Sequence, residues 1–382
     1  MKAGLLGRRL GHSLSPQIHR FFGDYDYCLY EREPEDVADF VRESGLDFLN
    51  VTIPYKQTVA HICDELTPLA ERLGNVNLVT RLSDGRFRGD NTDYFGFSQL
   101  LDFVCAAAGK AVPPRAAVLG AGGAALMAKA VLEDRCEEVA LVRRGEIPPQ
   151  DAEIIVNATP VGMFPDVDGR RIDIAGFPAC EIVLDLVYNP SPTRLVREAR
   201  ACGKTAEDGM VMLVAQAYRA FQLASPDASA PAGNLYIYGP PASGKTTWAR
   251  RIAAATGATL VDIDEEIVRK EGRTIADIFT NDGEATFRRI EKATLARVAS
   301  SRGQVVALGG GALLDDESRS IAEATGRVVL LECPEGELLR RAANSSDRPL
   351  LAGDKANRLA ALLASRRNHY ASFPVKISTW RQ

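Results

Sequence analysis

Two kinds of hydrophobic run alternate along this chain. Short apolar runs bounded by glycine, proline or charged residues predict strands, and longer runs with apolar residues at helical spacing predict helices. In the first part we expect strands at 47–53, 115–119 and 138–142, with helices at 58–73 and 124–132. Later in the chain, strands are expected at 234–238, 305–308 and 327–331, separated by helical runs. This alternation predicts α/β layers in both parts.

A stretch of small residues and prolines at 225–233 lies between the two parts and is typical of an interdomain linker. A chain of 382 residues suits two or three domains. Its hydrophobic content of 46% and charged content of 25% are those of an ordinary soluble protein.

The formal net charge of −4 gives no electrostatic reason to expect nucleic acid or an anionic membrane as partner. No apolar run approaches eighteen residues and the start lacks a signal-peptide core, so we expect a cytoplasmic protein whose partners are small-molecule substrates. The seven cysteines are scattered and form no Cys-x-x-Cys pair, which favours reduced packing residues over disulfides or zinc ligands.

One glycine-rich segment, Gly239-Pro-Pro-Ala-Ser-Gly-Lys-Thr246, follows the strand expected at 234–238 and precedes a helical run at 248–255. This is the context of a Walker A loop, whose backbone amides and helix N-terminus cradle phosphates. Lys245 would reach the β/γ oxygens and Thr246 would bind Mg²⁺. The sequence therefore predicts an ATP site made by Gly239, Ser243, Gly244, Lys245, Thr246 and Thr247.

Four further segments follow this loop. Asp262 and Asp264 stand two residues apart beyond an apolar strand, where one can support a metal and the other can face an acceptor hydroxyl. Then come Arg288 within 283–291, the triplet 309–311 and Arg348 within 348–351. In this order and spacing the motifs resemble shikimate kinase, over nearly all of 234–377.

The resemblance implies a P-loop domain with a parallel sheet that phosphorylates the 3-hydroxyl of shikimate from ATP. Such chemistry depends on positioning and cationic stabilisation. The roles it implies are metal support through water for Asp262, hydroxyl binding and proton removal for Asp264, carboxylate binding for Arg288, close backbone approach for Gly310 and Gly311, and charge neutralisation by Arg348 on a lid that includes 344–347.

The kinase-like part departs from the family pattern in two places. Where the family usually shows Arg-x-Pro-Leu-Tyr, this chain has 366–370, so Arg366 is our choice for the second carboxylate-binding arginine, with Arg367 as the alternative. The family also adds a terminal helix near the adenine after the strand expected at 375–378, whereas the given sequence ends at Gln382. The adenine contacts are therefore left open.

A second glycine-rich segment, Gly120-Ala-Gly-Gly-Ala-Ala125, joins the strand at 115–119 to a helix, as in dinucleotide-binding folds. Ala125 stands at the third glycine position and is an accepted small substitute. The next strand ends in Arg143 and Arg144 rather than in an acid, which favours the 2′-phosphate of NADP over the ribose of NAD, unless the pair is merely solvated. The cofactor-binding set is Gly120, Ala121, Gly122, Gly123, Ala124, Arg143 and Arg144.

Lys56 supplies a cation and Asp93 a carboxylate, a pair that suits proton transfer coupled to hydride transfer. Together with 12–16, 50–56, 90–93 and 208–216 they resemble shikimate dehydrogenases over residues 1–224. The resemblance implies catalysis by Lys56 and Asp93. It also implies substrate binding by Ser13, Ser15, Thr52, Asn77, Tyr188 and Gln216, and cofactor contact by Asn157 and Thr159.

Plainer roles remain open for some of these residues. Ser13 or Ser15 could cap the helix that Pro16 begins, and Thr52 could be an ordinary strand residue. Asn75 and Leu78 replace the small residue and the threonine usual around Asn77, so the fine substrate geometry is open as well.

The largest departure lies at 145–152, where only eight residues connect two strands. A crossover with a helix needs at least about ten to twelve residues, so we expect a bare loop and a shortened Rossmann domain. Eight extended residues span roughly 26 Å, enough to return along a short strand.

The resulting domain prediction has four parts: a substrate domain at 1–105 completed by a helix at about 206–224, a shortened Rossmann domain at 106–205, the linker at 225–233, and the kinase-like domain at 234–382. The leading interpretation is a fusion that reduces 3-dehydroshikimate with NADPH and then phosphorylates shikimate. One alternative is an active kinase whose dehydrogenase-like half is a non-catalytic binding scaffold. Another is oxidation of quinate or shikimate with NAD.

Overall fold

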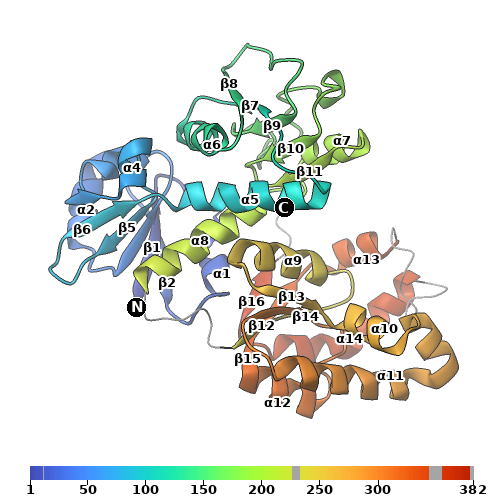
Figure 1. Ribbon diagram of the computed structural model, residues 1–382. Helices are drawn as coiled ribbons and strands as arrows, with labels where there is room; N and C mark the ends of the chain where they lie inside the picture. The colour runs from blue at the N-terminus through green and yellow to red at the C-terminus, as the bar shows by residue number, and fades with distance from the viewer. Residues whose placement is uncertain (12, 226–232, 344–354, 379–382) are drawn as a thin grey trace. The chain divides into compact units, whose positions relative to one another are not determined.

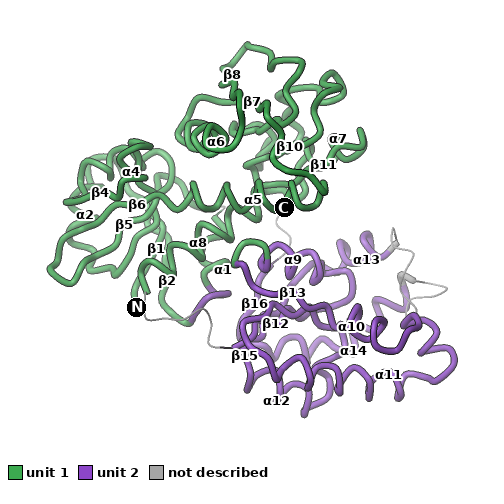
Figure 2. The backbone as a smooth tube through the Cα atoms, in the orientation of Figure 1, with its two compact units in different colours: residues 1–19, 24–227, 254–256 green, residues 20–23, 228–253, 257–382 purple. Residues whose placement is uncertain are grey.

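The structure of the protein is a computed structural model that describes residues 1–11, 13–225, 233–343 and 355–378 (Figure 1). The chain divides into two compact units, with residues 24–227 forming most of the first and residues 257–382 most of the second (Figure 2). Each unit contains parallel sheet, as the alternating pattern predicts. No helix in the described part of the chain is long and apolar enough to cross a membrane.

The first unit begins with a six-stranded mixed sheet in the order β2-β1-β3-β5-β6-β4. Strand β5 runs antiparallel to both neighbours, so β1, β3 and β6 end at the edge where β5 begins. Its strands are β1 (Lys2–Gly7), β2 (Asp26–Glu31), β3 (Phe48–Val51), β4 (Glu65–Leu66), β5 (Leu78–Arg81) and β6 (Phe87–Asp90). Its helices are α1 (Ser15–His19), η1 (Pro34–Asp36), α2 (Val37–Glu43), α3 (Lys56–Ala60) and α4 (Pro68–Leu73).

The prediction of one continuous helix at 58–73 is wrong. The segment instead contains α3, the short strand β4 and α4. Pro68 occupies the first turn of α4, and the Thr67 side chain accepts a hydrogen bond from Ala70 N, so a new helix begins there. Before it, β4 pairs with β6, an interaction with residues about twenty positions away that local periodicity does not report.

A second sheet in the first unit has five parallel strands in the order β11-β10-β9-β7-β8. Buried aliphatic side chains of β9 and β10 make its centre, as expected for strands covered on both faces. The strands are β7 (Arg115–Leu119), β8 (Glu138–Val142), β9 (Ile154–Asn157), β10 (Ile182–Asp185) and β11 (Thr205–Asp208). The helices around it are α5 (Thr92–Ala108), α6 (Gly123–Glu133), η2 (Ile174–Gly176) and α7 (Arg194–Ala201).

No helix interrupts the connection between β8 and β9, in agreement with the bare loop expected at 145–152. The helix expected at about 206–224 begins later than that range, because 205–208 form strand β11 and α8 runs from Met210 to Ala224. Helices α5 and α8 pack side by side (Figure 1).

The second unit contains one parallel sheet in the order β13-β14-β12-β15-β16, with β12 at its centre. The strands are β12 (Asn234–Tyr238), β13 (Thr259–Asp262), β14 (Gln304–Ala307), β15 (Gly326–Glu332) and β16 (Lys376–Ser378). The helices are α9 (Lys245–Thr256), α10 (Ile263–Glu271), α11 (Ile275–Ala299), α12 (Asp316–Thr325), α13 (Glu335–Ala343) and α14 (Lys355–Ala371). Helix α11 is kinked at Gly283, whose φ of 81° is non-helical.

The close contact of α5 with α8 depends on Gly96. A Cβ atom at this position would lie 2.8 Å from the backbone oxygen of Met212 and 3.1 Å from Cβ of Gln216. Gly96→Ala should therefore destabilise the first unit by about 1–3 kcal/mol through overpacking. Calorimetry of the full chain would show this as a lower melting temperature.

The matched control for this substitution is Gly336→Ala in α13, where nothing lies within 4 Å of the added Cβ. This change should leave stability unchanged or raise it slightly, because alanine loses less conformational entropy in a helix. Equal effects of the two substitutions would contradict the importance of the Gly96 contact.

Candidate functional site

Lys56 and Asp93 meet at the edge of the six-stranded sheet. Lys56 begins α3 just after β3, and Asp93 lies in the first turn of α5 just after β6. The Lys56 Nζ atom donates to Asp93 Oδ2 at 2.5 Å, and the side chains are 20% and 13% exposed. The pair is thus ordered yet accessible, as a proton-transferring pair must be.

Asn77 fixes the start of α5. Its Oδ1 atom accepts from Thr92 N at 2.6 Å, and its Nδ2 atom donates to Thr92 Oγ1 at 3.0 Å. Asn91 caps the same helix by accepting from Tyr94 N, and its own amide donates to Asn75 Oδ1 at 2.6 Å. These bonds hold Asp93 in place, so Asn77 has a positioning role besides the substrate contact predicted for it.

The two unusual residues around Asn77 are both accounted for by packing and hydrogen bonding. Asn75 joins the network described above and donates to Leu73 O at 3.0 Å. Leu78 is fully buried and packs with Phe48 and Ala220. Asn75 and Leu78 therefore both stabilise the structure next to Asn77.

A buried polar network extends from Asn77 to the serines of the predicted carboxylate site. Asn50 Nδ2 lies 3.5 Å from Asn77 O, and the Tyr27 hydroxyl donates to Asn50 Oδ1 at 3.0 Å. Burial raises the pKa of Tyr27 well above its usual value, and a hydrogen bond to Ser15 partly opposes this rise. Sequence reasoning missed Tyr27 and the role of Asn50. The one available signal was a polar residue inside the buried β3.

Ser13, Thr52 and Gln216 are the next predicted substrate residues of the first unit. Ser13 Oγ accepts from Ser15 N at 3.2 Å in a local turn that leads into α1, and Leu14 occupies the position before the helix. Thr52 follows β3 and donates its amide to Leu6 O at 2.9 Å. Gln216 lies on α8 and faces Gly96 of α5. Gly96 is one helical turn after Asp93 on that helix.

Tyr188 is half-buried and lies three positions after the end of β10. His12 lies outside the described residues.

The first glycine loop leaves the carboxyl end of β7. Gly120 has a φ of 128°, and a Cβ atom there would lie 3.1 Å from Ala158 O and 3.3 Å from Ala125 Cβ. Gly122 and Gly123 are exposed, with nothing within 4 Å of an added Cβ, and α6 begins at Gly123. The loop is therefore packed beneath and open above, as a pyrophosphate cradle requires.

The predicted basic pair emerges beside this loop. Arg143 and Arg144 are both exposed and follow β8 directly. Gly120 N donates to Val142 O at 2.9 Å, which ties the glycine loop to the residue before the pair. Arg171, a residue that sequence reasoning missed, donates to the carbonyl oxygen of Arg143 at 2.8 Å.

Asn157 and Thr159, predicted to lie along the cofactor, belong to a buried network around Asp185. Asn157 Nδ2 donates to Asp185 Oδ1 at 2.9 Å, and Asn157 Oδ1 accepts from the Thr159 hydroxyl at 2.6 Å. Thr193 Oγ1 donates to the other oxygen of Asp185 at 2.7 Å. Burial outweighs these bonds and raises the pKa of Asp185 to about 6.

The second glycine loop joins β12 to α9. Gly239 has a φ of 146°, and a Cβ atom there would lie 2.7 Å from Leu331 O. The Lys245 ammonium donates to the carbonyl oxygens of Gly239 and Pro240, each at 2.9 Å. The Ser243 hydroxyl is buried and has no hydrogen-bond partner in the described part of the chain. An orphaned donor inside the loop fits an anionic ligand.

The predicted metal residues also come together here. Thr246 Oγ1 donates to Asp262 Oδ2 at 2.8 Å, and Asp262 Oδ1 caps α10 by accepting from Asp264 N at 3.0 Å. Threonine hydroxyl and carboxylate oxygens are ligands suited to Mg²⁺ bound with phosphate. Among the described residues no group of three or more His, Cys, Asp or Glu side chains could hold a metal by itself.

The glycine triplet 309–311 lies against charged groups of α10 and α11. A Cβ atom at Gly311 would approach Arg288 Nη2 to 2.8 Å, and one at Gly309 would lie 3.6 Å from Asp264 Oδ1. Arg288 Nη1 donates to Glu291 Oε2 at 2.6 Å. Burial raises the pKa of Glu291, and the nearby positive charge of Arg288 partly opposes this rise. Sequence reasoning gave no role to Glu291, the last residue of the segment 283–291.

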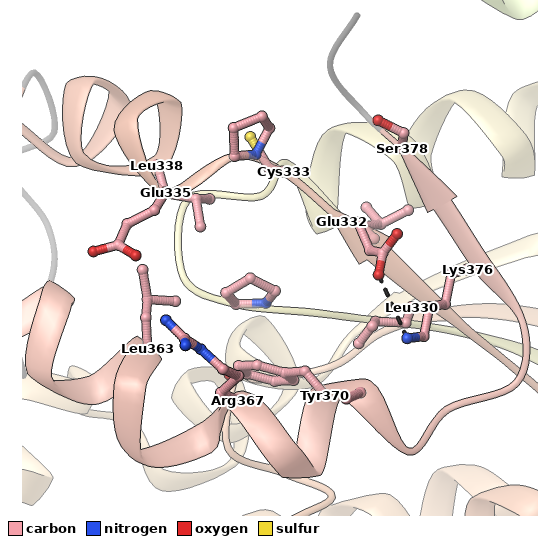
Figure 3. Close-up of a pocket in the computed structure, with 14 residues that line it drawn as sticks. Leu330, Glu332, Cys333, Glu335, Leu338, Leu363, Arg367, Tyr370, Lys376 and Ser378 are labelled. Atoms are coloured by element: carbon pink, nitrogen blue, oxygen red, sulfur yellow. Dashed lines mark ion pairs between the residues drawn. The ribbon is translucent and has the colours of Figure 1, made fainter.

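Arg366 and Arg367 have different surroundings. Arg366 Nη1 donates to Gly310 O at 3.0 Å, so it reaches the glycine triplet near Arg288. Arg367 instead lines a separate pocket of about 460 Å³, together with Pro240, Leu363 and other residues (Figure 3). This difference supports the choice of Arg366. Arg348 and the lid expected at 344–347 lie outside the described residues.

The pocket of Figure 3 is mostly apolar and lies at the carboxyl ends of β15 and β16, beside the second glycine loop. Tyr370 forms part of its floor, and Glu335 stands across the pocket from Arg367. Glu332 and Lys376 pair at 3.6 Å on another wall.

Comparisons with known proteins match both units. Residues 5–79 match the family model of the shikimate dehydrogenase substrate binding domain, and residues 241–381 match that of shikimate kinase. The shikimate dehydrogenase (NADP(+)) of Methanopyrus kandleri is 36% identical over 262 residues, which cover 58% of this chain and 88% of that protein. The corresponding protein of Clostridium perfringens is 32% identical over 249 residues, covering 58% of this chain and 90% of its own length.

Among solved structures, shikimate 5-dehydrogenase from Thermus thermophilus, in complex with NADP(H) and shikimate, is similar with a TM-score of 0.53 and 30% identity. The match covers 59% of this chain and 94% of that one. Fold and sites thus define a nucleotide-binding α/β protein with a dinucleotide-type loop in one unit and a Walker A loop in the other. The chain belongs to the shikimate dehydrogenase family and carries a shikimate kinase domain at its C-terminal end.

The raised pKa of Asp185 has a consequence for stability. Since its folded-state value is about 6 and its ordinary value is 3.8, the native state binds more protons than the unfolded state between these pH values. Stability of the first unit should therefore fall as pH rises from 4 to 6, by on the order of 3 kcal/mol from this group.

Hydrogen exchange of the β10 amides, corrected for intrinsic rates, would measure this change. Asp185→Asn cannot titrate and serves as the reference. As pH rises from 4 to 6, the wild type should lose stability relative to Asp185→Asn. A difference that does not change with pH would contradict the raised pKa.

Proposed function

We propose that the chain is a bifunctional enzyme of the shikimate pathway. The first unit would reduce 3-dehydroshikimate to shikimate with NADPH, and the second would phosphorylate shikimate from ATP. The observation that carries the proposal is the 2.5 Å Lys56–Asp93 pair in a chain that also has a complete phosphate loop and arginine site in its second unit. The family relationships of both parts agree with it. We expect both reactions to take place in the cytoplasm.

In the reduction, a hydride adds to the carbonyl carbon and a proton must reach the carbonyl oxygen. The Lys56 ammonium is placed to give that proton, with Asp93 holding it in position. Ser13, Ser15, Thr52, Asn77, Tyr188 and Gln216 would bind the carboxylate and hydroxyl groups of the substrate. NADPH supplies the hydride when bound.

NADPH is favoured over NADH by the surroundings of the glycine loop. The open faces of Gly122 and Gly123 fit a pyrophosphate, and exposed Arg143 and Arg144 stand where an acid would select the ribose of NAD. Ala121 and Ala124 complete the loop, and Asn157 and Thr159 would lie along the cofactor. This arrangement argues against the quinate reaction with NAD.

The alternative of a non-catalytic scaffold has less support. A scaffold has no need of an ordered Lys56–Asp93 pair, nor of an open pyrophosphate loop at Gly122 and Gly123. Both features are present despite the shortened connection between β8 and β9.

In the phosphorylation, the hydroxyl oxygen attacks the γ-phosphorus and gives up its proton, and ADP leaves. Asp264 would accept the proton, and Lys245 would stabilise the transferred charge. Thr246 and Asp262 would hold Mg²⁺ with the nucleotide, while Arg288 and Arg366 bind the shikimate carboxylate. Gly311 leaves room for the Arg288 guanidinium, since an added Cβ would lie 2.8 Å from Nη2. Gly310 and Gly311 would let the backbone approach the substrate closely.

The role of Lys56 can be tested within the intact chain. Lys56→Ala should lower kcat for NADPH oxidation with 3-dehydroshikimate by roughly 10²–10⁴-fold, because a positioned general acid is lost. ATP-dependent phosphorylation of shikimate by the same sample should not change.

Lys110→Ala is the matched control. Its ammonium pairs with Glu181, and its side chain is half exposed. Neither activity should change in this variant. Full dehydrogenase turnover in Lys56→Ala would contradict the assigned role, and absence of turnover in the wild type would favour the scaffold.

The two arginines of α14 provide a test in the second unit. Arg366→Ala should raise KM for shikimate by roughly 10–100-fold, since a charged hydrogen-bond donor to the carboxylate is lost. Arg367→Ala should leave this KM near the wild-type value, because Arg367 lines a different pocket. A coupled assay of ADP release measures both variants. An unchanged kcat at saturating shikimate would show that the second unit is folded, and dehydrogenase activity would confirm equal amounts of protein. If KM for shikimate rises in Arg367→Ala and not in Arg366→Ala, Arg367 is the residue that binds the shikimate carboxylate.

A further inference from the structure

The turn that carries the basic pair is closed on itself. Glu146 N donates to Arg143 O at 3.1 Å, and Arg143 N donates to Glu146 Oε2 at 2.7 Å. Gly145 provides the left-handed conformation that the turn needs, with a φ of 90°. Arg144 therefore stands at the outer corner of a defined turn.

Beyond this turn the connection to β9 offers little packing. It contains no helix, and Ile147 is 77% exposed. In a longer crossover, a helix lying against the sheet would hold the end of β8 in place. Here another part of the chain has to do so if Arg143 and Arg144 are to be ordered.

Arg171 makes that connection. Its Nη2 atom donates to Arg143 O at 2.8 Å and to Glu146 O at 3.2 Å, so one guanidinium bridges the first and last carbonyls of the turn. The next residue, Ile172, is buried in a hydrophobic cluster with Val142. The base of the Arg171 side chain is thereby fixed to the same core as the end of β8.

The charges around the turn also favour the binding of an anion. Arg171 adds a third guanidinium to the turn of Arg143 and Arg144 and offsets the carboxylate of Glu146, which is bonded to the Arg143 amide. Val142, the last residue of β8, accepts from Gly120 N at 2.9 Å, so the turn begins beside the pyrophosphate loop. An anionic group attached to the adenosine side of a bound dinucleotide would meet this turn.

We propose that Arg171 is a positioning residue for cofactor selection: it holds the turn 143–146 so that Arg143 and Arg144 receive the 2′-phosphate of NADPH. The proposal rests on the NADPH-dependent reduction proposed above. A turn ordered before binding loses less conformational entropy on binding, and only a ligand with the 2′-phosphate benefits.

The test compares Arg171→Ala, Arg171→Lys and the neighbouring control Arg170→Ala in the full chain. Arg170 pairs instead with Asp173 and Glu198. For each variant we would measure kcat, KM for NADPH, KM for 3-dehydroshikimate and kcat/KM with NADH. Fluorescence titration would give Kd for NADPH and NADH separately. The kcat and the KM for 3-dehydroshikimate would report on folding of the first unit, and shikimate phosphorylation would confirm equal amounts of protein.

In Arg171→Ala, KM and Kd for NADPH should rise about tenfold. This is the size of effect expected when the charge-assisted hydrogen bonds of one guanidinium are lost. The kcat, the KM for 3-dehydroshikimate and all NADH values should stay unchanged, so the preference for NADPH should fall about tenfold. Arg171→Lys should give an intermediate value, because lysine keeps the charge and the N–H donors but its side chain is shorter than the one that places Nη2 between the two carbonyls. Arg170→Ala should match the wild type.

The outcomes separate this proposal from the one it rests on. If the wild type neither oxidises nor binds NADPH, the proposed reduction and the role of Arg171 both fail. If the wild type is active and Arg171→Ala behaves like Arg170→Ala, only the role of Arg171 fails. Equal losses with NADPH and NADH, or a loss of kcat, would show a general structural effect and would also overturn the proposal.

Discussion

Parallel strands place their carboxyl ends at one edge of a sheet, and the functional groups of this protein follow from that constraint. Strands β7 and β8 deliver the first glycine loop and the basic pair to one edge. Strands β12, β13 and β14 deliver the Walker A loop, Asp262 and the glycine triplet to another. In the mixed sheet, β3 and β6 run in the same direction and bring Lys56 and Asp93 together. Residues far apart in sequence thereby become neighbours.

Much of this arrangement could be predicted, because the strands are short apolar runs with clear limits. The strands expected at 115–119, 138–142 and 234–238 have those bounds in the structure. The segment 58–73 could not be predicted in the same way, because its helical periodicity spans two helices and a strand. The pairing of β4 with β6 depends on residues about twenty positions away, and β11 likewise exists through pairing with β10.

The sites show a similar division. Lys56, Asp93, Lys245 and Thr246 could be found because they stand at fixed positions in recognisable motifs. The side chain of Asn77, by contrast, binds Thr92, and the choice between Arg366 and Arg367 depends on which way each leaves α14. Arg171 carried no signal at all, since its contact with the turn joins residues 28 positions apart. Motif spacing identifies reactive groups, whereas the groups that orient them depend on tertiary contacts.

The position of the Lys245 ammonium affects how the second unit would meet its nucleotide. In the structure this charge is solvated by two carbonyl oxygens of its own loop, Gly239 O and Pro240 O. A phosphate that approaches Lys245 must therefore compete with these two acceptors, so binding is an exchange of partners rather than the occupation of a vacant charge. Such an exchange favours multiply charged ligands over weakly charged ones, because two of the three ammonium N–H groups already donate to neutral carbonyls.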